Sequence, residues 1–230
     1  MLERFAEEIW TADGPIISVI GFRFPTRMIV IRLSDGGLLI WSPVAFSDEL
    51  RSAVDRLGPV RHIVAPNHLH DLFLEGWYRA FPEAELHAPP KLRARHPELD
   101  WGRDLGDTPA PEWADDIDQI IVRGNWVTTE VVFFHRRSRT AIFTDLIQQF
   151  EPGWFKGWRG VMAKMDGMTA PRPTVLIKYR IAFYDRGTAR AAVRRILEWP
   201  SEALLAAHAP PVRHGGRDAI ARAFEWLLRR

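Results

Sequence analysis

The feature of the sequence that most constrains the fold is an alternation of strand and helix patterns over residues 38–88. Apolar runs typical of strands are separated by segments with helical start and stop signals, with strands at 38–41, 61–65 and 86–88 and helices at 48–57 and 72–81. A strand–helix–strand–helix–strand succession favours parallel pairing of the strands. The pattern therefore predicts an α/β layer.

Further strand patterns lie on both sides of this layer. Residues 15–22 and 28–33 are typical of strands, and the glycine-containing turn 34–37 leads back into 38–41 as an antiparallel meander. After a polar loop at 96–116, strands are expected at 117–122, 131–134, 140–144, 175–177 and 203–207, and helices at 187–199 and 216–228. No linker-like composition separates the two halves, so the sequence predicts one domain over residues 1–230.

Composition excludes several classes of protein. The 230 residues are 47% hydrophobic, which is enough for a sizeable core. The 31 basic and 29 acidic residues give a formal net charge of +2, which argues against a dedicated nucleic-acid binder. The absence of cysteine excludes disulfides and thiolate metal sites. No signal-peptide pattern and no apolar run near the ~20 residues of a membrane span is present, so we expect a soluble cytoplasmic protein with no transmembrane segment.

The segment with the clearest chemistry follows the expected strand at 61–65. Pro66 cannot donate a ladder hydrogen bond, so the strand is expected to end there. His68, His70 and Asp71 would then lie in a loop at the carboxyl end of the strand, where α/β proteins commonly place ligands and catalytic groups. Imidazoles one residue apart suit a single zinc or iron ion.

Two further expected strands end in possible metal ligands, Asp145 and His208. If the strands lie in neighbouring sheets, these side chains converge with His68 and His70 around Zn²⁺, Fe²⁺ or Mn²⁺ with an open coordination position. Each residue alone also has a structural interpretation, as a helix cap or as a partner for loop backbone. The other five histidines have no partner at metal spacing, and we interpret them as surface or core residues: His62, His87, His96, His135 and His214.

The order of these elements resembles the metallo-β-lactamase-like superfamily. A β-meander, a helix, a strand ending in His-x-His, a hairpin ending in Asp and a late strand ending in His occur in that order over nearly the whole chain. The segments that carry the resemblance are residues 32–40, 63–71, 140–146 and 206–211. The resemblance implies an α/β fold, a four-layer αβ/βα sandwich, with a metal site between its two sheets.

The chain departs from the family pattern in the histidine loop. Where the family motif continues with Asp-His after its two histidines, this chain has Leu72 and Phe73. A register shifted by one residue puts Asp71 at the aspartate position. Asn67 and Leu69 then replace the first two histidines, and the sequence leaves the choice of register open.

Other family ligands are also replaced. Asn125 stands where the family has its middle histidine, and Ser42 stands where an aspartate usually follows the third strand. The resemblance therefore implies a reduced site for at most one divalent ion, and the sequence leaves open that none is bound. The predicted ligands are His68, His70, Asp145 and His208, with Asp71 or Glu130 as replacements.

We therefore expect a metal-dependent hydrolase of a small ester, thioester, lactone or phosphodiester, using Zn²⁺, Fe²⁺ or Mn²⁺. Asp71 and Asp145 are the predicted catalytic carboxylates, with Asp71 orienting the attacking water or accepting its proton. The alternative is a non-catalytic protein that binds a small ligand or a protein partner in the vacated cleft. The aromatic segment 154–158 is interpreted as a lid, as a contact with a membrane or partner, or as a helix packed into the core.

Overall fold

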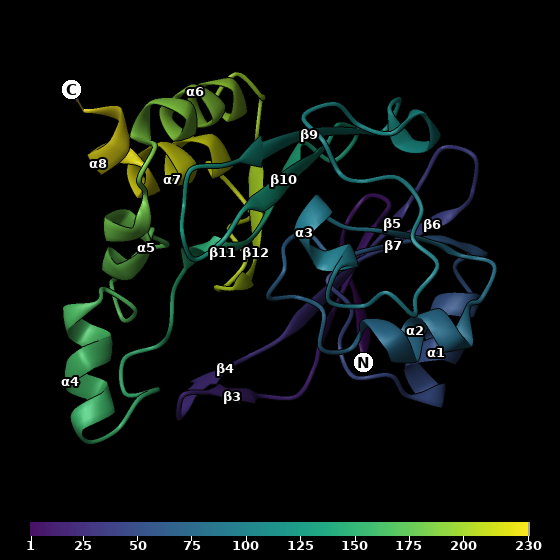
Figure 1. Cartoon of the computed structure of the whole chain (residues 1–230), viewed down its shortest axis with the longest axis horizontal. Coiled ribbons are helices and arrows are strands. Elements are labelled where there is room, and N and C mark those ends of the chain that lie inside the picture. The colour runs from purple at the N-terminus through teal and green to yellow at the C-terminus, as the bar shows by residue number, and fades with distance from the viewer. Residues whose placement is uncertain (230) are drawn as a thin grey trace.

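The computed structural model describes residues 1–229, in which two β-sheets pack face to face between two layers of helices (Figure 1). The six-stranded sheet has the order β1 (Leu2–Ala6), β2 (Ile9–Asp13), β5 (Arg27–Arg32), β6 (Leu38–Trp41), β7 (Val60–Val64) and β8 (Glu85–His87). The four-stranded sheet has the order β12 (Ala203–His208), β11 (Thr140–Gln148), β10 (Glu130–His135) and β9 (Ile117–Val122). The predicted four-layer α/β sandwich is confirmed.

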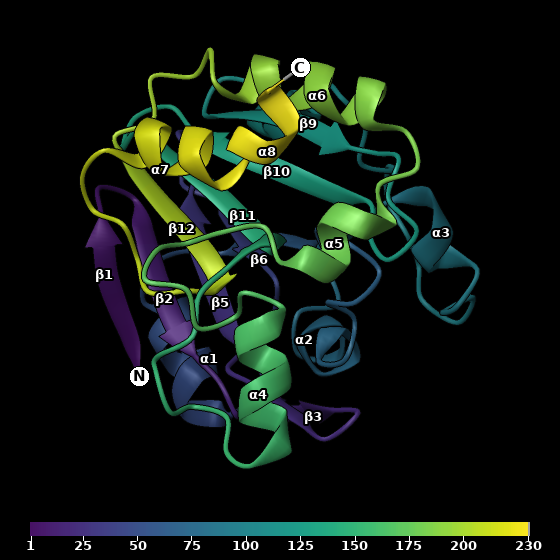
Figure 2. The same cartoon turned by 90° about the vertical axis from the view of Figure 1, so that its left-hand side faces the viewer.

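The helices divide between the two outer faces. On the six-stranded side lie α1 (Asp48–Asp55), α2 (Leu74–Ala80) and the short α3 (Pro90–Arg93). On the four-stranded side lie α4 (Trp158–Met165), α5 (Ile177–Ala182), α6 (Arg186–Ile196), α7 (Gly216–Ala223) and α8 (Glu225–Leu228), as Figure 2 shows. None of the helices in the described part of the chain is long and apolar enough to cross a membrane.

The expected parallel layer is present in β6, β7 and β8. Helices α1 and α2 connect these strands, and the Ser47 side chain caps α1 by accepting the N–H of Leu50. Both faces of the parallel strands are covered, which explains their continuous apolar character. The sheet therefore places the carboxyl ends of β6 and β7 side by side.

Three apolar layers hold the sandwich together. Trp41 and Phe133 meet in the layer between the sheets, Trp77 and Leu86 in the layer under α2, and Phe143 and Phe224 in the layer under α7 and α8. All six side chains are buried. Burying a large apolar side chain stabilises the fold by roughly 2–3 kcal/mol relative to leaving it exposed.

Several expected elements were wrong in detail. Residues 15–22 do not form one strand but part of a hairpin of β3 (Ile17–Val19) and β4 (Phe22–Phe24), because Ile20 and Gly21 both take positive φ and turn the chain. Residues 175–177 do not form a strand, since α5 starts there. The first two strands, β1 and β2, were not foreseen, because their apolar and polar residues do not alternate clearly.

The aromatic segment 154–158 packs against the β3–β4 hairpin, at the end of the molecule where α4 and β3 lie in Figures 1 and 2. Phe155 is buried and contacts Phe22, while Trp154 donates its indole N–H to the carbonyl oxygen of Arg23 at 2.8 Å. Trp158 is 58% exposed and begins α4. The segment therefore anchors the hairpin through its first residues and leaves its last aromatic ring at the surface.

Candidate functional site

A cleft of about 350 Å³ opens where β6, β7, β11 and β12 end. Its walls are mostly apolar and come from the β3–β4 hairpin and the loops that follow β6 and β7. The polar or charged residues in its lining are Thr26, Ser42, His70, Asp145, Lys178, Tyr179 and His208. An apolar cleft of this size with a few converging polar groups is typical of a small-molecule site.

Three of the four predicted metal ligands meet at this cleft. Nε2 of His70 lies 3.2 Å from Oδ2 of Asp145, and Nε2 of His208 lies 3.3 Å from Oδ1 of the same carboxylate. The side chains are 10%, 7% and 5% exposed for His70, Asp145 and His208. Parallel pairing of β11 with β12 brings Asp145 beside His208. Their role as metal ligands stays a prediction.

Hydrogen bonds on the far side of both rings point Nε2 towards Asp145. Nδ1 of His208 lies 2.7 Å from the carbonyl oxygen of Pro25, which can only accept, so this nitrogen carries a proton. Nδ1 of His70 lies 2.7 Å from Oγ of Ser42. If the His208 ring is neutral, the lone pair on its Nε2 faces the negatively charged carboxylate of Asp145, which is unfavourable. A cation held between the two groups, or a second proton on the ring, makes the arrangement favourable.

The donor set fits a small divalent ion. Two ligand atoms on one tetrahedral zinc ion lie about 3.3 Å apart, given zinc–nitrogen distances of about 2.0–2.1 Å. The two His–Asp distances here are 3.2 and 3.3 Å, each to a different oxygen of the Asp145 carboxylate, so each is close to one edge of such a site. One ligand atom from each of His70, Asp145 and His208 lies within 4.8 Å of the other two. Two imidazoles and one carboxylate facing a cleft match the chemistry of a one-metal site with an open position.

Asp145 is oriented by a further side chain. Nδ2 of Asn67 donates to Oδ2 of Asp145 at 2.7 Å and to Oγ1 of Thr144 at 2.9 Å. Burial raises the pKa of Asp145, but its interactions with His70 and His208 outweigh burial and hold the pKa well below its usual range. The carboxylate is therefore ionised at neutral pH, as a metal ligand requires.

Ser42 supports His70 from a strained backbone position. It directly follows β6 and has a φ of 54°, which is uncommon for a residue with a side chain. Its side chain is buried and hydrogen-bonded to His70. Strain of this kind costs about 1–3 kcal/mol and is often found at functional sites. The family resemblance marked Ser42 only as a lost aspartate, so its contact with His70 could not be foreseen.

Glu130 begins β10 and is fully buried. Its carboxylate accepts the backbone N–H groups of Thr144, Asp145 and Leu146 at 2.8, 2.8 and 2.9 Å. Burial, followed by the charge of Asp145, raises the pKa of Glu130 to about 7, while the N–H bonds oppose the rise. Because the backbone uses both oxygens, Glu130 positions Asp145 and does not join the three ligands as a replacement.

The other two predicted loop residues lie outside the group. Oδ2 of Asp71 lies 2.9 Å from Nε2 of His96 and 3.3 Å from Nη2 of Arg95. The carbonyl oxygen of His68 accepts a hydrogen bond from Arg95 at 2.7 Å. The cleft lining contains neither His68 nor Asp71 among the described residues. The metal role of His68 and the catalytic role of Asp71 stay predictions that these contacts do not support.

The interpretation of His62 and His87 as histidines without a partner at metal spacing was wrong. Nδ1 of His62 lies 3.1 Å from Nε2 of His87, and a carboxylate oxygen of Glu85 lies 3.8 Å from the same nitrogen. Adjacent parallel strands bring these residues together although 25 positions separate the two histidines. The one signal in the sequence is the i, i+2 spacing of Glu85 and His87 in a strand.

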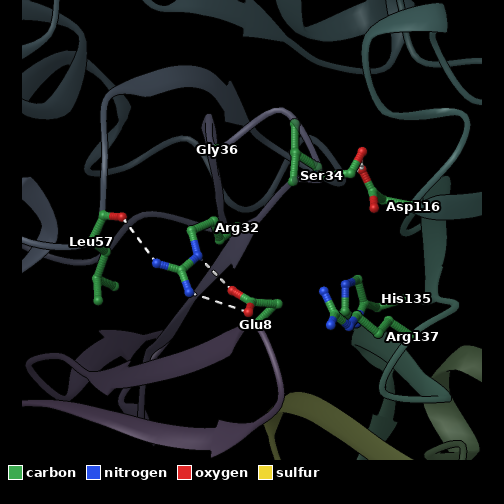
Figure 3. Close-up of a pocket in the computed structure, with 9 residues that line it drawn as sticks. Glu8, Arg32, Ser34, Gly36, Leu57, Asp116, His135 and Arg137 are labelled. Carbon is green, nitrogen blue, oxygen red and sulfur yellow. Dashed lines mark hydrogen bonds and ion pairs between the residues drawn. The ribbon is translucent and has the colours of Figure 1, made fainter.

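A second cavity, of about 320 Å³, lies at the opposite ends of the strands (Figure 3). The guanidinium of Arg32 makes two hydrogen bonds to Glu8, at 2.5 and 3.2 Å, and a longer one to the carbonyl oxygen of Leu57 at 3.5 Å. Ser34 donates to Asp116 from its N–H and its hydroxyl. Since these charged groups already satisfy one another, the cavity offers less chemistry than the cleft.

The paired sheets, the helices on both outer faces and the His/Asp group at the strand ends define a protein of the metallo-β-lactamase-like fold. Within that class, the chain belongs to the family of a domain of unknown function, DUF4336, whose sequence profile matches residues 6–156. No curated protein matches the chain in sequence.

Solved structures share the fold at low sequence identity. A metallo-β-lactamase from Pontibacter korlensis is 11% identical, with coverage of 100% of this chain and 99% of the other and a TM-score of 0.63. The FIM-1 metallo-β-lactamase from Pseudomonas aeruginosa, in a mono-zinc form, is 10% identical over 99% and 94% of the two chains, with a TM-score of 0.65. The flavodiiron core of Flv1 from Synechocystis is 13% identical over 99% and 60%, with a TM-score of 0.66.

Proposed function

We propose that the protein is a metal-dependent hydrolase of a small ester, thioester or lactone, with one divalent ion held by His70, Asp145 and His208. The observation that carries the proposal is the convergence of these side chains, spaced as metal ligands, at an apolar cleft. The structurally similar FIM-1 enzyme has a mono-zinc form, so this fold can hold a single ion. Zn²⁺, Fe²⁺ and Mn²⁺ all suit this donor set.

A divalent ion at this position would supply Lewis acidity, which lowers the pKa of a bound water and polarises a substrate carbonyl. Asp145 is ionised and buried between two imidazoles, so it is suited to hold the ion. Its lowered pKa does not favour the predicted role of this carboxylate as a proton acceptor. Ser42 and the carbonyl oxygen of Pro25 fix the orientations of the two rings.

Tyr179 is a neutral hydrogen-bond donor that could stabilise an oxyanion in the cleft. It lines the cleft and is only 4% exposed. Burial, followed by the charges of Asp145 and Glu130, raises the pKa of its phenol well above 10.0, so the hydroxyl keeps its proton. A protonated phenol at the cleft is suited to donate a hydrogen bond to the oxygen on which negative charge develops.

The lining of the cleft favours acyl substrates over a phosphodiester. Lys178 is the one cationic side chain in that lining, and its Nζ lies 3.5 Å from a carboxylate oxygen of Asp166. Phosphoryl transfer depends on several positive groups around the phosphate oxygens. An ester, thioester or lactone with an apolar acyl part therefore suits this cleft better.

A second candidate function is ligand binding without catalysis. Asn67 donates to Oδ2 of Asp145, the oxygen nearest His70, and Asp71 is engaged by His96 and Arg95. Both contacts remove groups that a hydrolase could use. The apolar cleft would in that case bind a small hydrophobic molecule.

The test compares the wild type with His208→Ala. The chain is purified without added metal, and its Zn, Fe and Mn are measured alongside hydrolysis of p-nitrophenyl butyrate, a short acyl thioester, a γ-lactone and bis(p-nitrophenyl) phosphate. We expect His208→Ala to lose one equivalent of metal and at least 100-fold in kcat/KM on one of the three acyl substrates. His135→Ala, which removes a buried histidine hydrogen-bonded to Ser138, is the matched control.

An unchanged metal content in His208→Ala would contradict the proposal. Loss of metal without hydrolysis of any acyl substrate by the wild type would support the second candidate function. Hydrolysis of the phosphodiester alone would be consistent with the proposed metal site but would contradict the proposed acyl substrates.

A further inference from the structure

A second group of potential metal ligands lies within the six-stranded sheet. His62 on β7 is paired in register with Glu85 on β8, and Glu85 and His87 are two residues apart on that strand. Residues i and i+2 of a strand point to the same face, so one face of two neighbouring strands carries all three side chains. His62 and His87 are buried, whereas Glu85 is partly exposed.

The spacing of the two histidine nitrogens is close to an edge of a tetrahedral site, and the carboxylate oxygen lies somewhat farther away. The distances to Nε2 of His87 are 3.1 Å from Nδ1 of His62 and 3.8 Å from Oε2 of Glu85. One tetrahedral zinc ion separates its ligand atoms by about 3.3 Å. The ligand atoms of all three residues lie within 4.8 Å of one another. Small side-chain adjustments of Glu85, the most exposed of the three, would complete the geometry.

The hydrogen bonds of His87 direct its Nε2 at the proposed site. Nδ1 of His87 lies 3.3 Å from the carbonyl oxygen of Arg103, which leaves the Nε2 lone pair directed at His62 and Glu85. Without an ion, Nδ1 of His62 donates to this lone pair, so an ion at the site takes the place of that proton and His62 carries its proton on Nε2 instead.

The charges around these three residues favour the binding of a cation. The charges that act on His62 come from the acidic Glu85, Glu112 and Asp35 and from one base, Arg61. The indole of Trp113 packs edge-on against both imidazoles, with ring centroids 5.1 and 4.8 Å away. The rings are thus held in place, and the Glu85 side chain is partly exposed to solvent.

We propose that His62, Glu85 and His87 bind one Zn²⁺ ion at a site separate from the cleft, with a water as the fourth ligand. The site would tie the edge strand β8 to β7. None of the three residues belongs to the cleft lining, and His70 lies beyond the end of β7. The proposal does not rest on the proposed hydrolase activity. A hydrogen bond between the two histidines without metal is the competing explanation.

The experiment titrates the chelator-treated protein with Zn²⁺ and with Co²⁺. Stoichiometry is read by calorimetry and by elemental analysis, and the visible spectrum of bound Co²⁺ reports the coordination geometry. We expect His208→Ala to keep one equivalent of zinc, and His208→Ala/His87→Ala to keep none. Addition of zinc should raise the Tm of the single variant and not that of the double variant. His208→Ala/His135→Ala is the matched control and should keep one equivalent.

The His87→Ala substitution removes a buried side chain and could prevent folding, so Glu85→Gln in the His208→Ala background provides a second test. Glu85 is partly exposed and its replacement by Gln is conservative. We expect this variant to fold and to bind zinc at least tenfold more weakly. The proposal is overturned if His208→Ala binds no zinc, or if Glu85→Gln leaves the affinity unchanged. Failure of the proposed function would instead show as metal retained in the cleft without hydrolysis.

Discussion

Glu130 accepts the backbone N–H of Asp145 at 2.8 Å and so fixes the segment of β11 that carries the central carboxylate of the cleft. The same carboxylate accepts the N–H groups of Thr144 and Leu146. Pairing of β11 with β12 shifts register between Phe143 and Gln148, so these amides lack regular ladder partners from β12. A buried carboxyl group in β10 therefore shapes the backbone that presents Asp145 to His70 and His208.

Replacement of Glu130 by Gln should destabilise the protein by about 2–3 kcal/mol, because the amide leaves one buried N–H group without an acceptor. Urea unfolding at pH 7 measures the change in the free energy of unfolding. Glu112→Gln, at an exposed position, is the control and should change it by less than about 0.5 kcal/mol. Equal effects in the two variants would show that Glu130 does not stabilise this segment of β11.

Ser42→Ala should weaken metal binding in the cleft about 10- to 100-fold, since it removes the hydrogen-bond partner that orients His70. Calorimetric titration with zinc measures the affinity. Ser201→Ala is a suitable control, because Ser201 is also buried and its hydroxyl has no hydrogen-bond partner among the described residues. If Ser42→Ala binds zinc as tightly as the control, the hydrogen bond between Ser42 and His70 does not contribute to metal binding.

The ion pair of Glu8 and Arg32 at the second cavity should make stability depend on pH (Figure 3). The hydrogen bond from Arg32 is the largest cause that lowers the pKa of Glu8 below 4.5. A carboxyl with a depressed folded pKa adds stability above its unfolded pKa, and this contribution is lost as the pH falls through the folded value. Because the pair is partly exposed, Glu8→Gln should cost about 0.5–1 kcal/mol at pH 7 and less at about pH 3. Unfolding curves of both proteins at the two pH values test this, and an equal cost at both would contradict it.

Most of the fold could be predicted from the sequence because the local signals for strands, helices and turns agree with the observed structure. Ser47 caps α1, Pro66 follows the end of β7, and the turn at residues 34–37 joins β5 to β6. It did not foresee β1, whose pattern is irregular, or the start of α5 in a short apolar run. In each case tertiary packing decides between structures that local propensity leaves nearly equal.

The candidate site was foreseen less completely, for a geometric reason. Asp145 and His208 could be placed because strand ends in neighbouring strands converge. The loop after Pro66 could not, since the direction of each side chain depends on how the loop turns. It turns so that Asn67 and His70 both face Asp145. Contacts between distant strands, such as His62 with His87, leave almost no local signal in a single sequence.

Asp71 offers the sharpest test of that loop. Its carboxylate lies 2.9 Å from His96, and this hydrogen bond is the largest cause of the raised pKa of His96. Arg95 contacts both Asp71 and the carbonyl oxygen of His68. Asp71, Arg95 and His96 therefore form a clamp on the loop that carries His70. If the clamp is the role of Asp71, Asp71→Asn and His96→Gln should reduce kcat/KM by similar factors, each below about tenfold, and the double variant should show little further loss.

A catalytic role for Asp71 predicts a different result. Asp71→Asn would then lower kcat by at least about 100-fold with KM and metal content unchanged, as expected for loss of a general base. His96→Gln would have a far smaller effect, because it leaves the carboxylate in place. Steady-state kinetics of the three variants, with metal content measured on the same preparations, distinguish the two roles. The contacts of Asp71 with His96 and Arg95, and its position outside the cleft lining, lead us to expect the first result.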